Sequence, residues 1–173
     1  MFIRIKKIKN NHYAYLVENK WRKRRKNKVK QKTLKYLGKI YKVGKESAPR
    51  NINSEEFKNT SIKKLIIELI RNELNSHNFK EIKNNIFELD NSLVDLEKKE
   101  VINKNSKKQI CLELNNNFLC SYTLRKLLNF KPKKNLTKIQ IGKQLANTFE
   151  SAGISISKEV FVYIAQKIIK EIK

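Results

Sequence analysis

Hydrophobic and polar residues alternate with period two near the start of the chain, which is the pattern of half-buried β-strands. The alternation occurs at residues 2–8, 12–18 and 28–36, where β-branched and aromatic residues are frequent. In the first strand Ile3 and Ile5 share one face. The two asparagines after Lys9 suit a tight hairpin turn, because asparagine tolerates positive φ. This segment therefore predicts a three-stranded antiparallel sheet.

The hydrophobic period changes to that of a helix after residue 53. Ser54 is a good N-cap, and two acidic residues follow it where the helix dipole favours negative charge. These features predict a long helix over 54–76. Its apolar residues fall on one stripe at helical spacing: Ile62, Leu65, Ile66, Leu69, Ile70 and Leu74.

Short apolar segments then return, at 86–89, 93–102 and 109–115. Each is rich in strand-forming residues, and the polar segment 103–106 suits a turn between the last two. The pattern predicts a second, small antiparallel sheet whose residues carry no net charge.

The end of the chain reads as helices. Residues 121–130 form a short amphipathic segment, and Thr137 with Gln140 has the spacing of a capping box for a helix that continues to about residue 151. Gly153 suits the end of that helix, and Ser157 suits the start of the last one. The last helix has an apolar face made of Phe161, Ile164, Ala165, Ile168 and Ile172.

The order of elements predicts an α+β fold: an N-terminal three-stranded antiparallel sheet, a long helix, a second small antiparallel sheet and a C-terminal helical hairpin. The predicted domains are a basic β-hairpin module at 1–46, a linker at 47–53, and an α+β domain with C-terminal helices at 54–173. At 39% hydrophobic residues, the chain has enough apolar side chains for a core.

The charge of the chain is large and unevenly placed. The formal net charge is +24, of which residues 1–53 contribute +16, residues 54–120 contribute nothing and residues 121–173 contribute +8. A lysine bias that came from genome composition would spread along the whole chain. The uneven placement therefore predicts a polyanionic partner, most simply nucleic acid.

The candidate nucleic-acid-binding residues are cations of the first strands and of the loop between the second and third, together with one tryptophan. They are Arg4, Lys6, Lys7, Lys20, Trp21, Arg22, Lys23, Arg24, Arg25, Lys26, Lys28, Lys30, Lys32 and Lys35. Lysines at every second position of a strand form a row on one face, which suits a phosphate backbone. Trp21 has two interpretations, packing on the sheet and stacking on a base. A second basic patch is predicted at Lys131, Lys133 and Lys134.

The first strands also resemble a known protein segment. The residues that carry the resemblance are Ile3, Arg4, Lys6, Lys7, Tyr13, Tyr15, Leu16, Val17, Glu18, Val29, Lys30, Gln31, Thr33, Leu34, Tyr36, Leu37 and Gly38. Over about residues 2–40 the sequence resembles the extreme N-terminal segment of some DDE-class insertion-sequence transposases, and of small standalone archaeal-type proteins that share it. The resemblance implies a DNA-contacting accessory element. Transposase activity is not implied, because the three catalytic carboxylates of the RNase H-like domain have no counterpart here.

Other site chemistry finds little support in the sequence. Gly153 follows Ala146 by seven residues, which does not fit the usual helix-turn-helix spacing. Asp90 with the E-x-K at 97–99 only superficially resembles a nuclease core. The cysteines at 111 and 120 lack the spacing of a zinc site and are expected to be free thiols in a reducing cytoplasm. No catalytic residue, metal or cofactor is predicted, and no segment is apolar for long enough to span a membrane.

The sequence therefore predicts a non-enzymatic, cytoplasmic DNA-binding protein with modest sequence preference. In that role it would associate with the nucleoid. Two alternatives remain open: an RNA-binding or ribosome-associated protein, and a protein-interaction domain that the basic module tethers to nucleic acid. The C-terminal domain is a candidate surface for a homodimer or a protein partner.

Overall fold

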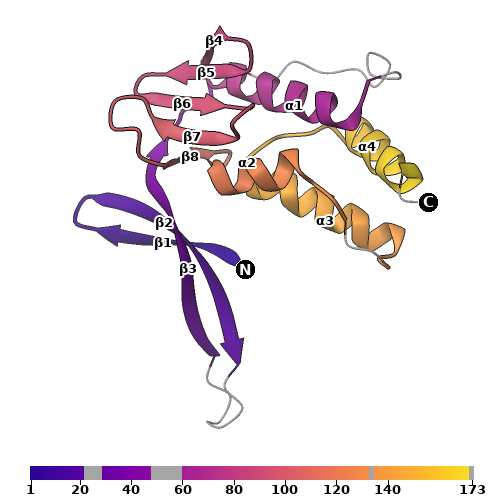
Figure 1. The fold of residues 1–173 in the computed structure, drawn as a ribbon, viewed down its shortest axis with the longest axis horizontal. Coiled ribbons are helices and arrows are strands. Elements are labelled where there is room, and N and C mark those ends of the chain that lie inside the picture. Colours follow the sequence, from indigo (N-terminus) through magenta and orange to yellow (C-terminus); the bar gives the residue numbers. More distant parts are fainter. Residues whose placement is uncertain (22–28, 48–59, 133–134, 172–173) are drawn as a thin grey trace.

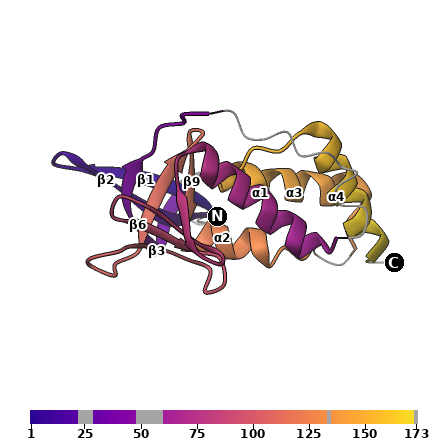
Figure 2. The same cartoon turned by 90° about the horizontal axis from the view of Figure 1, so that it is seen from above.

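The computed structural model describes residues 1–21, 29–47, 60–132 and 135–171, and its fold class is α+β, as predicted. Within these residues the chain forms two sheets and four helices, whose elements follow one another in the order β1–β3, α1, β4–β9, α2–α4. Figures 1 and 2 show the helices gathered at one end of the molecule and the strands at the other.

The N-terminal strands are β1 (Phe2–Ile8), β2 (Asn11–Trp21) and β3 (Val29–Lys42), paired antiparallel. The β2 and β3 strands are longer than the sequence indicates. Ile8 pairs with Asn11, and the positive φ of the tight turn between them, 54°, belongs to Lys9 rather than to an asparagine.

This sheet has five strands, because β8 (Ile110–Leu114) and β9 (Asn117–Cys120) extend it in the order β1-β2-β3-β8-β9. The C-terminal part of β3 pairs with β8 in parallel, with Ile40 beside Cys111. The prediction that residues 109–115 belong to the second sheet is therefore wrong. Within the described residues, the link to that sheet is an isolated bridge between Ile102 and Gln109, the residue before β8. The domain division at 47–53 stays a prediction, and one sheet contains strands from both sides of it.

The second sheet is antiparallel and contains β4 (Lys80–Lys83), β5 (Ile86–Leu89), β6 (Ser92–Asp95) and β7 (Glu100–Asn103). The predicted single strand 93–102 is wrong, because β6 and β7 form a hairpin. At the turn, one carboxylate oxygen of Asp95 accepts hydrogen bonds from the backbone N–H of Glu97 at 3.0 Å and of Lys98 at 2.8 Å. Lys99 supplies the positive φ.

The four helices are α1 (Ile62–Ser76), α2 (Ser121–Leu128), α3 (Lys138–Ser151) and α4 (Lys158–Glu171). The predicted start of α1 is corrected: Ser61 is the N-cap, and Ser54 lies outside the described residues. The capping box of Thr137 and Gln140 is confirmed. Gly153 follows the C-cap of α3 with a φ of 70°, and the Ser157 hydroxyl accepts from the backbone N–H of Val160.

Two hydrophobic clusters hold these elements together. The larger contains the predicted stripe of α1 and apolar residues of the second sheet, β8, β9 and the C-terminal helices. The smaller lies under the N-terminal sheet and consists of Ala14, Leu16, Leu37, Cys111 and Cys120. The two cysteines are free, buried and directly opposite each other on β8 and β9. Hydrogen bonding with Cys120, together with burial, raises the pKa of the Cys111 thiol.

Glu73 of α1, only 1% exposed, joins four parts of the chain. Its carboxylate accepts hydrogen bonds from Lys45 Nζ after β3 at 3.1 Å and from Asn115 Nδ2 in the β8–β9 turn at 2.7 Å. It also accepts from the backbone N–H of Ser155, between α3 and α4, at 2.8 Å. His77 Nε2 lies 3.3 Å away. Burial opposes ionisation of Glu73, but the hydrogen bonds from Asn115, Ser155 and Lys45 outweigh it and lower the pKa.

Glu73→Gln should therefore reduce the free energy of unfolding by about 3 kcal/mol at neutral pH, because it removes the charge that these donors stabilise. The pKa of the folded state lies below the ordinary value of 4.5. The loss should be complete above about pH 5 and should vanish as the pH falls through the lowered pKa. Denaturant unfolding at a series of pH values measures it. Glu68→Gln, at a more exposed ion pair of the same helix, is the control, and equal losses in both variants would contradict the assignment.

Gly38 allows β3 to approach β8. Its φ is 137°, and a Cβ there would lie 2.6 Å from the backbone oxygen of Gln109. Gly38→Ala should cost about 3 kcal/mol of stability, since the methyl group would clash with the backbone at Gln109 and the positive φ is strained for alanine. Gly44→Ala is the matched control, with no atom within 4 Å of the added carbon. Denaturant midpoints compare the two, and similar midpoints would show that the close approach is unimportant.

Candidate nucleic-acid interface

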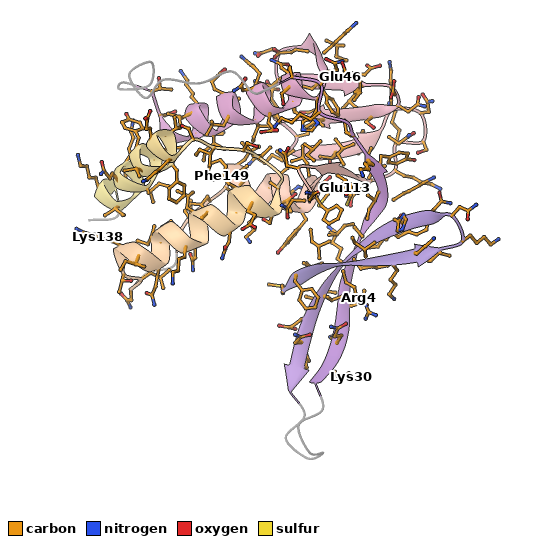
Figure 3. The ribbon with its side chains drawn as sticks, turned by 180° about the vertical axis from the view of Figure 1, so that it is seen from behind. Arg4, Lys30, Glu46, Glu113, Lys138 and Phe149 are labelled. Carbon is orange, nitrogen blue, oxygen red and sulfur yellow. The ribbon has the colours of Figure 1, made fainter. Side chains whose placement is uncertain are left out.

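The β2–β3 ribbon projects away from the rest of the molecule (Figure 1). Its last registered pairs are Lys20 with Lys30 and Trp21 with Val29. In Figure 3, Lys30 lies on this projecting part, far from Lys138 and Phe149 of α3. The predicted loop cations Arg22, Lys23, Arg24, Arg25, Lys26 and Lys28 lie outside the described residues, as does the side chain of Trp21, so the predictions for them stay open.

Two bulges in β3 decide which way its side chains point. The register shifts between Ala14 and Tyr15 and again between Leu16 and Val17, which leaves Leu37 and Leu34 as extra residues of β3. Strict alternation would place Lys35 on the opposite face from Lys30 and Lys32. The extra residue at Leu34 instead brings all three lysines to the same face.

That face, here called the lysine face, carries four exposed ammonium groups: Lys20, Lys30, Lys32 and Lys35. Directly opposed residues of paired strands share a face, so Lys20 accompanies Lys30, and Lys35 accompanies the buried Leu16. Glu18, opposite Lys32, is the only acidic residue in the first 42 of the sequence. The lysine row predicted from alternation is therefore present for Lys30 and Lys32, and it gains Lys20 and Lys35.

The other face, here called the tyrosine face, carries Arg4, Lys6, Tyr13, Tyr15, Tyr36 and Lys39. The ring centroids of Tyr15 and Tyr36 are 5.4 Å apart, and those of Tyr13 and Tyr36 are 6.3 Å apart. The ammonium group of Lys6 lies 4.9 Å from the centroid of Tyr15.

The structure thus separates the predicted cations of β1. Arg4 and Lys6 belong to the tyrosine face, whereas Lys7, opposite His12, points to the other side of the sheet. The tyrosine cluster was not predicted as a site, although alternation alone places Tyr13 and Tyr15 together. Tyr36 joins them only through the bulge at Leu37.

A second cationic surface surrounds a cavity of about 380 Å³ between α2 and α3. The cavity is lined by Arg125, Lys126, Asn129, Phe130, Lys131, Gln144, Asn147 and Thr148, none of which is acidic. The positive charge of Arg125 is partly compensated by the carboxylate of Glu100, whose Oε1 lies 3.4 Å from Nη2 of the arginine. Of the predicted second patch, Lys131 lies here, and Lys133 and Lys134 lie outside the described residues. Arg125 and Lys126 were not predicted as site residues, although their place in the last turn of an amphipathic helix could have indicated a cationic surface there.

Within the described ranges, no group of three His, Cys, Asp or Glu side chains is placed to hold a metal ion. No described helix combines the length and the apolar character that crossing a bilayer requires. Comparison with known proteins finds no relatives. No protein-family model, curated protein or solved structure matches this chain. The surfaces described above are therefore the basis for any functional assignment.

Proposed function

We propose that this protein binds DNA without catalysing a reaction, and that the lysine face of the β2–β3 ribbon contacts the phosphates. The observation that carries the proposal is the set of four exposed lysines on one face of a projecting ribbon. Lysine ammonium groups that neutralise phosphates release condensed counterions, which makes such binding strongly dependent on salt.

The shape of the ribbon favours duplex DNA as the partner. The major groove of B-form DNA is wide enough to admit a two-stranded β-ribbon, whereas that of A-form RNA is too narrow for side chains to read. Lysine is a mobile point charge and does not form the fixed bidentate pairs by which arginine reads guanine. Sequence preference is therefore modest.

The cavity between α2 and α3 serves as a second phosphate contact in this proposal. Arg125, Lys126 and Lys131 supply charge there, and the side-chain amides of Gln144 and Asn147 supply further donors. The proposal includes a cytoplasmic location, which the free thiols of Cys111 and Cys120 support, since paired cysteines in oxidising compartments form disulfides.

The triple variant Lys30→Gln, Lys32→Gln, Lys35→Gln should weaken duplex binding more than tenfold. It should also lower the log–log salt slope by about 2.7, because each lost phosphate contact on B-form DNA removes about 0.9. Fluorescence anisotropy with a labelled blunt duplex at several salt concentrations measures both values.

A control with the same change in net charge is available on the second sheet. Lys80→Gln, Lys83→Gln, Lys98→Gln removes three exposed ammonium groups far from the ribbon in sequence. This control should keep its affinity within about twofold and retain the wild-type slope. Equal losses in the two triple variants would mean that net charge, and not the lysine face, is responsible.

The variant Arg125→Gln, Lys126→Gln, Lys131→Gln should weaken binding of a long duplex several-fold. Combined with the lysine-face variant, its effect on the logarithm of affinity should add, because the two sets of residues lie on different elements, β3 on one side and α2 with the segment after it on the other. The same anisotropy titration measures both, with unfolding midpoints to confirm that the variants are folded. Wild-type affinity in this variant would exclude the cavity from the interface.

A further inference from the structure

The tyrosine face carries one exposed ring, that of Tyr36, and two half-buried rings, those of Tyr13 and Tyr15. Tyr36 is 47% exposed, and Tyr13, Tyr15 and Tyr36 belong to neither hydrophobic cluster. The opposite face of β2 buries Ala14 and Leu16 in the smaller cluster. On the tyrosine side the sheet meets the larger cluster only further along, through Ile110 and Leu112 of β8. Among the described residues, core packing therefore does not account for the three tyrosine rings.

The rings are held in place by their neighbours. Tyr36 stands between Tyr13 and Tyr15, tilted by 42° and 54° to their planes. The centroid separations of 6.3 and 5.4 Å are typical of interacting aromatic pairs. On the next strand, Arg4 Nη1 donates a hydrogen bond to Gln31 Oε1 at 2.7 Å, which positions a guanidinium group on the same side of the sheet.

The charge of the tyrosine face is entirely positive. The ammonium group of Lys6 lies over the ring of Tyr15. Lys39, which pairs with Tyr13, has its ammonium group 5.3 Å from the ring centroid of Tyr41. Burial and the neighbouring Tyr15 and Tyr13 raise the pKa of Tyr36, so its phenol stays neutral and does not repel a phosphate. Aromatic rings interleaved with cations on an exposed sheet face match the chemistry of an unpaired nucleotide strand, which offers a base to stack and a phosphate to neutralise.

We propose that the tyrosine face binds unpaired bases of a single-stranded nucleic acid, with Tyr36 as the stacking ring and Arg4 and Lys6 as phosphate contacts. This inference rests on the proposed function and specifies which form of nucleic acid the protein binds. Because the lysine face takes a duplex and the tyrosine face takes an unpaired strand, the preferred ligand is a duplex that continues into a single-stranded end.

The test compares three labelled oligonucleotides with equal numbers of phosphates: a thymine single strand, a blunt duplex, and a duplex with a thymine overhang. Wild-type protein should bind the overhang duplex more tightly than the blunt duplex. Tyr36→Leu should weaken binding of the single strand and of the overhang duplex about tenfold, and change blunt-duplex affinity less than twofold. Tyr36→Phe keeps the ring and should stay within twofold of wild type on all three.

Wild-type single-strand affinity in Tyr36→Leu, or tighter wild-type binding of the blunt duplex, would overturn the inference. Neither outcome bears on duplex binding by the lysine face, which the triple lysine variant tests separately. Should Tyr36→Leu fail to fold, Arg4→Gln with Lys6→Gln tests the same face and should weaken single-strand binding with a lower salt slope. Unchanged binding there would also overturn the inference.

Repeating the series with single-stranded RNA of matched length identifies which strand the tyrosine face prefers. Because either strand would stack a base on Tyr36, Tyr36→Leu should lose affinity for single-stranded DNA and for single-stranded RNA.

Discussion

The parallel pairing of β3 with β8 joins the projecting ribbon to the core of the protein. It makes one strand serve both as an arm of the projecting ribbon and as a central strand of the sheet against the core. The close approach needs Gly38, where any side chain would meet the backbone of the β8 segment. Just beyond β3, Lys45 reaches the buried carboxylate of Glu73. The ribbon is thereby fixed at its base while its far end stays exposed.

The two bulges of β3 explain how one ribbon presents two different surfaces. Each extra residue reverses the direction in which the following side chains point, so lysines gather on one face and tyrosines on the other. The same irregularity buries Leu37 and leaves Leu34 exposed. Because only one carboxylate, that of Glu18, is present among the first 42 residues, neither face is neutralised by its own strand neighbours.

Much of the fold could be predicted, because helices that bury one face show an apolar stripe and a cap in the sequence itself. The stripe of α1 and the capping box at Thr137 are examples. The β6–β7 turn could not be predicted, since it uses the Asp95 carboxylate and positive φ at Lys99 without glycine or proline. The β3–β8 pairing joins distant segments and leaves no local signal. Lys35 and Tyr36 could not be assigned to faces, because alternation fails at a bulge that only the partner strand reveals.

Protection of lysine amines from acetylation, with and without duplex DNA, measures whether the lysine face contacts the phosphates. Mass spectrometry reads each lysine separately, so the protein serves as its own control. DNA should protect Lys20, Lys30, Lys32 and Lys35 strongly and leave the exposed Lys80, Lys83 and Lys98 of the second sheet unchanged. Uniform protection of both groups, or protection of the second sheet alone, would contradict it.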